Sequence, residues 1–233
     1  MNNCLKLLNI VLLAVLVAIP GAVCPTEKDT FSDANTELFL TDHLGKINAP
    51  SRLLYDFSKT GTLEEAFRDT VEVRFVGTPT EDTKRVEIVF FTGERSRTVP
   101  PMTVSDGNPV IMIFLQREVS EMGRLTGGSW RHFQKMIKLA LENEAEISEV
   151  KVPYGDQAIP GLKIRITPYL EDPLLANFKR FAHRYYEFTL SGNVPGYVYQ
   201  IRTVDPGNDA ENKTAANSDL LVEETLTYRA LIE

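Results

Sequence analysis

Hydrophobic and polar positions alternate along much of the chain after residue 50. In residues 52–58, Leu53, Tyr55 and Phe57 lie on one face, and most of the residues between them are polar. This period of two predicts a β-strand with one buried and one solvated face. The same pattern predicts seven further strands, at residues 70–75, 86–90, 147–152, 162–166, 186–190, 197–201 and 222–228. Strands with one polar face are typical of antiparallel rather than parallel sheets.

A helical pattern separates the two groups of strands. Asn108 and Pro109 suit the N-cap and the first position of a helix. The run at 110–115 is apolar on all sides, so a buried helix and a strand both fit it. From Trp130 to Leu141, apolar residues recur at helical spacing and predict an amphipathic helix. A short helix is also predicted after Asp172.

Together these elements predict an α+β fold, with a mainly antiparallel sheet and two to three helices packed on one face. We expect a single domain at residues 51–233, because no linker rich in proline or serine separates the two groups of strands. Residues 205–219 are rich in Gly, Asn, Asp and Ala and predict a long exposed loop. Residues 24–50 are mostly polar and predict a flexible N-terminal segment. Within it, the apolar island at 38–40 fits an edge strand or a docking segment.

The first 23 residues have the pattern of an export signal peptide. Lys6 precedes an unbroken apolar run at residues 10–19, and Pro20-Gly21-Ala22 ends that run. The run is too short for a membrane-spanning helix, which needs roughly 20 apolar residues. We therefore expect an exported protein, in the periplasm or secreted, with no transmembrane span after cleavage.

Cys24 follows the predicted signal directly, whereas Cys4 lies within it. Because only one cysteine would remain after cleavage, no disulfide is expected within the mature chain. Cys24 fits either a bystander at a flexible terminus or the lipidated first residue of a bacterial lipoprotein, anchored to the outer membrane. A lipoprotein signal favours Leu three residues before the cysteine and a small residue directly before it. Gly21 and Val23 stand there, so lipidation is the less favoured alternative.

Charge and motif content narrow the function classes. The chain has 25 basic and 32 acidic residues, a formal net charge of -7, which argues against binding to nucleic acid. His43, His132 and His183 are scattered, and neither a zinc motif nor a phosphate-binding loop is present. We therefore predict no metal site, no cofactor and no catalytic residue.

Aromatic residues on several predicted strands suggest one candidate site. They can form an ordinary core under the helices, or they can line a cavity for an acyl chain or another apolar ligand. The residues that would line such a cavity are Tyr55, Phe57, Phe75, Phe90, Tyr186, Phe188 and Tyr199.

The start of the predicted helix at 130–141 suggests a second candidate. Ser129, Arg131 and Lys135 would suit an anion, because a helix N-terminus attracts negative charge. The alternative is a simple junction between two helices, with basic residues in solvent. Ser129 and His132 could also share a helix face, but a hydrolase would need an orienting carboxylate as well.

Leu54-Tyr55-Asp56-Phe57, the glycine turn at Gly61 and the amphipathic strands, behind an export signal, resemble the half-barrel proteins of the bacterial cell envelope. These include the periplasmic lipoprotein carriers and their uncharacterised exported relatives. The resemblance implies a curved, half-barrel-like sheet and transfers no functional residue. Residues 108–135 depart from the carrier pattern and look more like exported bacterial proteins with no assigned activity.

These observations favour a non-catalytic cell-envelope protein that binds a lipid or another apolar or acyl ligand in a curved-sheet cavity. The alternative is a protein–protein interaction or chaperone-like module of the envelope. A third hypothesis is a hydrolase acting on cell-wall or lipid material. It requires His132 or His183 within hydrogen-bond reach of a serine or a carboxylate.

Overall fold

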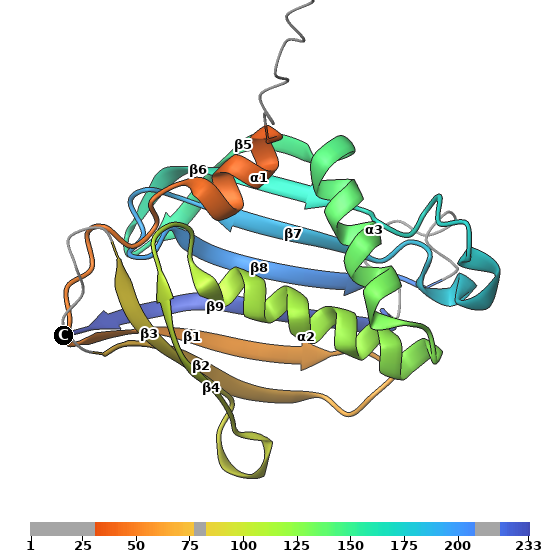
Figure 1. The fold of residues 1–233 in the computed structure, drawn as a ribbon, viewed down its shortest axis with the longest axis horizontal. Helices are drawn as coiled ribbons and strands as arrows, with labels where there is room; N and C mark the ends of the chain where they lie inside the picture. Colours follow the sequence, from red (N-terminus) through yellow and green to blue (C-terminus); the bar gives the residue numbers. More distant parts are fainter. Residues whose placement is uncertain (1–30, 77–82, 208–219) are drawn as a thin grey trace, which may run out of the picture. The chain divides into compact units, whose positions relative to one another are not determined.

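An open antiparallel sheet forms the framework of the computed structural model, which describes residues 31–76, 83–207 and 220–233 (Figure 1). Nine strands build it in the described part of the chain, in the order β4-β3-β2-β1-β9-β8-β7-β6-β5. The strands are β1 Ser51–Thr60, β2 Phe67–Phe75, β3 Lys84–Phe90, β4 Arg97–Val104, β5 Glu146–Tyr154, β6 Gln157–Ile166, β7 Tyr185–Leu190, β8 Val198–Asp205 and β9 Val222–Ile232. All eight strands predicted from alternation are therefore confirmed.

The last strand joins two meanders. β1 to β4 follow one another in the first half of the sheet, and β5 to β8 in the second half. β9 lies between β1 and β8, and Leu226 pairs with Phe57 on one side and with Ile201 on the other. The two halves thus become one sheet only when the C-terminal strand is in place.

Helices cover one face of this sheet. Figure 1 shows α1, α2 and α3 on the same side, with α2 running across the middle. The α-helices are α1 Asp33–Asn35, α2 Pro109–Thr126 and α3 Trp130–Asn143, and short π- or 3-10 turns are η1 Thr36–Leu40, η2 Gly93–Arg95, η3 Leu175–Asn177 and η4 Lys179–Phe181. The α+β class and the helices at 109–126 and 130–143 are confirmed. Where a strand also fitted residues 110–115, the structure has a helix.

The hydrophobic core lies between the sheet and these helices. In β1, Leu53, Tyr55 and Phe57 are buried, while their neighbours are half-buried or exposed. Val110 and Phe114 of α2 are buried against the same face. Alternation along the strands therefore places the apolar side chains under the helices, as the period of two requires.

The segment at 31–50 corrects the predicted flexible N-terminus. It belongs to the same compact unit as the sheet, and it buries four apolar residues, Ala34, Leu38, Leu44 and Ile47. The apolar island at 38–40 lies in the π-helical turn η1, so it docks on the core and is not an edge strand. A mostly polar composition hid these apolar residues, because they are widely spaced along the segment.

Other differences concern irregular elements. β4 was not predicted, because Pro100 and Pro101 interrupt its pattern, and proline is tolerated in a strand at the edge of a sheet. The predicted short helix after Asp172 consists of the two 3-10 turns η3 and η4. The predicted signal peptide with Cys24 lies outside the described residues, as does most of the predicted loop at 205–219.

No helix in the described part of the chain combines the length and the apolar character needed to cross a membrane.

Candidate functional site

Six of the seven aromatic residues of the first candidate site belong to the hydrophobic core between the sheet and the helices. Six are buried in the single hydrophobic cluster that α2 and α3 cover: Tyr55, Phe57, Phe75, Phe90, Tyr186 and Phe188. Tyr199 differs, because it lies at a β-bulge between β7 and β8 and is half-buried. Protein side chains therefore fill the space above most of these rings.

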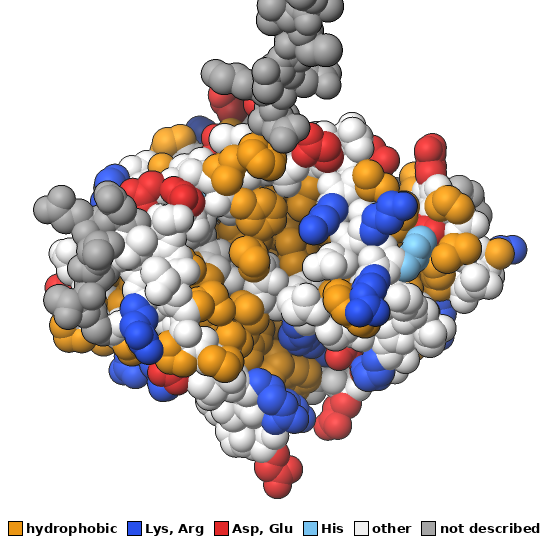
Figure 2. Space-filling model, viewed as in Figure 1, with side chains coloured by type: hydrophobic (Ala, Val, Ile, Leu, Met, Phe, Trp, Pro, Cys, Tyr) orange, Lys and Arg blue, Asp and Glu red, His pale blue; other side chains and the backbone are white. Residues whose placement is uncertain are grey.

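Two cavities open at the borders of the helix layer in the described part of the chain. One lies beside α2 and the strands β1 to β4, and has a volume of about 700 Å³. The other lies beside η1 and the hairpin β5–β6, with about 670 Å³. Figure 2 shows the face that carries the helices, where hydrophobic side chains gather in a hollow and Lys and Arg side chains stand at its rim.

The cavity beside α2, called the α2 cleft below, has an apolar wall. Its apolar lining side chains are Phe67, Phe90, Phe91, Val99 and Ile113. The Phe67 and Phe91 rings meet edge to face, with centroids 5.5 Å apart. Phe57 supports this wall from the core, 4.7 Å from the Phe91 ring. The wall is therefore an aromatic surface with a rigid backing.

Phe91 has an unusual backbone conformation. Its φ angle is +65°, in the left-handed region that a bulky side chain rarely adopts. The conformation follows directly after β3, and the Phe91 N–H still donates to the Thr70 carbonyl at 2.9 Å. Such strain persists only where the surrounding structure imposes it, and it is common at ligand sites.

Charged side chains surround the apolar wall. Five cationic residues line the cleft, namely Lys59, Arg95, Arg97, Arg117 and Arg124, and three acidic residues, namely Glu64, Glu65 and Glu121. Arg117 lies over the Phe91 ring, with its guanidinium carbon 5.6 Å from the centroid. The cleft thus combines an apolar surface with an excess of positive side chains.

A buried ionic network holds the cationic floor of the cleft in place. Arg117 donates two hydrogen bonds to Glu224 of β9, one of them at 3.0 Å, and a third to Glu118 at 2.9 Å. The Lys59 ammonium lies 3.2 Å from Glu224. The Arg184 guanidinium lies 3.6 Å from the Glu118 carboxyl group. The network therefore joins α2 to β1 and β9.

The pKa values of the two carboxyl groups in this network are shifted in opposite directions. Burial raises the pKa of Glu118 to about 8, and the negative charge of Glu224 adds to the shift. Burial also disfavours the ionised form of Glu224, but the charge and hydrogen bonds of Arg117 outweigh it and lower the pKa of Glu224. Glu118 therefore holds its proton to a higher pH than Glu224 does.

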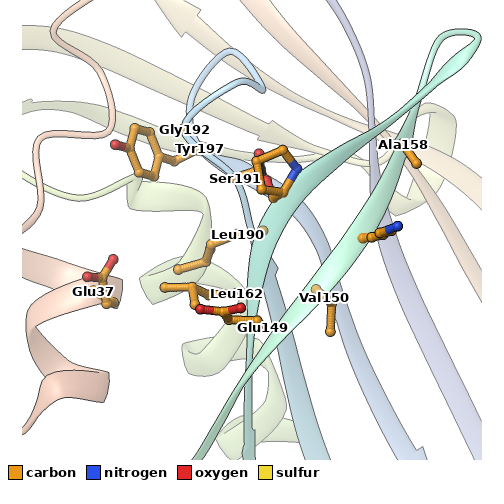
Figure 3. Close-up of a pocket in the computed structure, with 12 residues that line it drawn as sticks. Glu37, Glu149, Val150, Ala158, Leu162, Leu190, Ser191, Gly192 and Tyr197 are labelled. Atoms are coloured by element: carbon orange, nitrogen blue, oxygen red, sulfur yellow. Dashed lines mark hydrogen bonds between the residues drawn. The ribbon is translucent and has the colours of Figure 1, made fainter.

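The second cavity, called the β6 groove below, is shown in Figure 3. Leu162 and Leu190 lie between Glu37 on one side and the strand that carries Val150 on the other. Tyr197 closes one end; its φ angle is +64°, and its ring stacks on His43 at a centroid distance of 4.8 Å. The groove lies next to β5, an edge strand of the sheet.

The residues of the predicted anion site do not line either cavity. Ser129 is the N-cap of α3, but its side chain makes no capping hydrogen bond. Arg131 lies over the ring of Trp130, 4.7 Å from the centroid, and Lys135 is exposed. This arrangement matches the alternative of a helix junction with solvated basic residues.

His132 has a partner that the sequence did not reveal. Its Nε2 lies 2.7 Å from Asp172 Oδ2, and Asp172 is buried. Asp172 also accepts a hydrogen bond from the Leu174 N–H at 2.8 Å, and the His132 ring lies near Phe178. The contact joins α3 to the segment that carries η3, so its role is to hold these two segments together.

Metal ligands do not gather in the described residues, where no group of three or more His, Cys, Asp or Glu side chains could hold an ion. Comparison with family models and with curated proteins finds no match for the chain. The geometry of the two cavities is therefore the basis for any functional assignment.

Proposed function

We propose that this chain is a non-catalytic exported protein of the cell envelope and that it binds an apolar or acyl ligand in the α2 cleft. The observation that carries the proposal is the cleft itself. Its volume of about 700 Å³ lies within the range of small-molecule sites, roughly 300–1,000 Å³. Five apolar side chains form its wall, and charged side chains surround that wall.

The proposal places the ligand at one border of the aromatic face. Phe90 belongs both to the predicted aromatic set and to the cleft lining. Most of the other predicted rings are covered by α2 and α3, so a ligand reaches the apolar interior beside α2. A half-barrel in which helices lie across the concave side of a curved sheet is the architecture that we infer from this arrangement and from the resemblance to envelope carriers.

Titration of the protein with N-phenyl-1-naphthylamine, a neutral and environment-sensitive fluorophore, tests the proposal. We expect saturable binding by the wild type and at least about tenfold weaker binding by Ile113→Trp, because the larger side chain would fill the cleft. Met112→Trp is a matched control, since Met112 is 63% exposed on the same helix and does not line the cleft. Unsaturable binding, or equal affinities of the two variants, would contradict the proposal.

Export is a separate part of the proposal. It rests on residues 1–23 and is tested by mass spectrometry of the mature N-terminus after expression in a bacterium. A free terminus near residue 23 supports a secreted or periplasmic protein, and a diacylated Cys24 supports an outer-membrane lipoprotein. An intact N-terminus in the cytoplasmic fraction would contradict export.

A second candidate function is binding of a partner protein at the other border of the sheet. β5 is one of the two edge strands, its residues are mostly exposed, and the β6 groove lies beside it. An extended segment of a partner could add to this edge by main-chain hydrogen bonds. Lys151→Pro would remove a backbone donor that points away from β6, because Lys151 and Pro160 form a non-hydrogen-bonded pair of the hairpin. We expect this variant to abolish capture of such a partner from the envelope fraction. Unchanged capture would exclude this edge.

A further inference from the structure

The α2 cleft differs in charge from the rest of the molecule. The chain has a formal net charge of -7, yet five of the eight charged side chains that line the cleft are cationic. A local excess of one sign in a concave, partly apolar site concentrates the field and attracts the opposite charge. The cleft is therefore suited to a ligand that is apolar at one end and anionic at the other.

Three of the five cations already have carboxylate partners. Lys59 lies between Glu64 and Glu224, and Arg117 binds Glu224. Arg124 pairs with Glu64 and Glu121 on the surface. These cations are neutralised by the protein itself.

Arg95 and Arg97 have no such partner among the described residues. The Arg95 guanidinium lies over the Phe67 ring, 4.7 Å from its centroid. A guanidinium stacked on a ring keeps its in-plane N–H groups free for a carboxylate or a phosphate. Arg97 donates to the main-chain carbonyls of Ser96, at 2.8 Å, and Glu94, at 3.4 Å, so its charge is also uncompensated.

Both arginines line the cleft together with the apolar wall. They belong to η2 and to the start of β4, directly after the strained Phe91. Arg95 covers Phe67, which is itself part of the wall. An acyl chain lying against this wall would therefore carry its head group toward the two guanidinium groups, whose charge no carboxylate among the described residues compensates.

We propose that the α2 cleft binds an anionic amphiphile, with its acyl chain against the aromatic wall and a carboxylate or phosphate head group between Arg95 and Arg97. This inference rests on the proposed function and specifies its ligand class. Phe67 serves both ends of the ligand, because it lines the wall and orients Arg95.

Competition with the bound fluorophore tests the inference. The competitors are dodecanoate, dodecyl phosphate and dodecanol, which share one chain and differ in the head group. We expect at least one of the two anions to bind about tenfold more tightly than dodecanol, since two exposed ion pairs together are worth about that factor. The tighter anion identifies the head group. High salt should reduce this preference, because it screens exposed charges.

Variants assign the preference to residues. Arg95→Ala/Arg97→Ala should bind both anions no better than dodecanol. Arg95→Lys/Arg97→Lys keeps the charge and should retain part of the preference. Arg131→Ala is the matched control, because Arg131 is exposed, lies 4.7 Å over an aromatic ring as Arg95 does, and is outside the cleft.

The outcomes separate the inference from the function on which it rests. If the wild type binds dodecanol and both anions equally, or if the double alanine variant keeps the preference, the head-group inference is wrong and the apolar cleft stands. The same holds if Arg131→Ala removes the preference. If neither the fluorophore nor any competitor binds, the proposed function itself fails.

Discussion

Glu118 links the stability of the fold to pH. The folded protein keeps the proton of this buried carboxyl group up to a pKa of about 8, whereas the unfolded chain releases it near the ordinary value of 4.5. The unfolded state therefore binds fewer protons between these values, so the free energy of unfolding falls as pH rises through this window. Glu118→Gln should flatten that fall, because the amide keeps the shape and does not ionise.

Urea denaturation at pH 5, 6.5 and 8 measures the effect of Glu118→Gln. We expect the variant to lose less stability than the wild type between pH 5 and pH 8. Glu121→Gln, on the partly exposed side of the same helix, should follow the wild-type curve. A variant curve parallel to that of the wild type would show that Glu118 is ionised in the folded state.

Phe91 should tolerate a substitution that its neighbour does not. Phe91→Gly removes a ring from the cleft wall but also relieves a left-handed backbone, which costs roughly 1–2 kcal/mol for a non-glycine residue. Phe90→Ala removes a buried ring from ordinary β backbone and should cost about 3–5 kcal/mol. We expect Phe91→Gly to cost less than half as much in denaturant unfolding, and yet to weaken fluorophore binding. Equal losses of stability would contradict the relief of strain.

The N-cap residues of α2 and α3 contribute unequally to the stability of the fold. Asn108 accepts a hydrogen bond from the Val110 N–H and donates to Tyr55 Oη at 2.9 Å and to the Gly196 carbonyl at 2.8 Å. Asn108→Ala should therefore cost about 2–4 kcal/mol, the loss of a cap and of buried partners. Ser129→Ala should cost under about 0.5 kcal/mol, because Ser129 makes no capping bond. Thermal unfolding of both variants measures the difference, and similar midpoints would refute it.

The elements of this fold could be predicted where one period continues over several residues. β1 and α3 each bury one face, so their apolar residues recur at the period of a strand or of a helix, and this period is visible in the sequence. β4 has Pro100 and Pro101 in its middle, and η1 has too few residues for a period. These elements are held by tertiary packing and by their place at an edge, which a local pattern does not contain.

The candidate site was less predictable than the fold, because its parts come together only in the whole molecule. The sequence pointed to an aromatic face, and its alternative of an ordinary core under the helices describes most of that face. The α2 cleft joins Phe67 of β2, Phe91 after β3 and Ile113 of α2. Arg95 ends the short turn η2 and Arg97 begins β4, and no sequence motif marks either residue. No feature of the sequence distinguishes Glu118 from the acidic residues on exposed faces, and only the structure shows its burial.

At the scale of the whole molecule, the position of β9 predicts a single cooperative unit. Leu226 is fully buried at the seam between the two meanders, paired with Phe57 and Ile201. Leu226→Ala should lower the free energy of unfolding by about 2–5 kcal/mol. Ile147→Ala, on the edge strand β5, should change it by under about 0.5 kcal/mol.

The number of unfolding transitions tests this prediction more directly than the midpoint of unfolding does. The only tryptophan, Trp130, begins α3 and reports on the helix layer, while far-UV circular dichroism reports on the helices and strands together. In the wild type and in Leu226→Ala, the two signals should change at the same denaturant concentration, because neither meander is a complete sheet without β9. Two separate transitions would mean that each half folds without the strand between them.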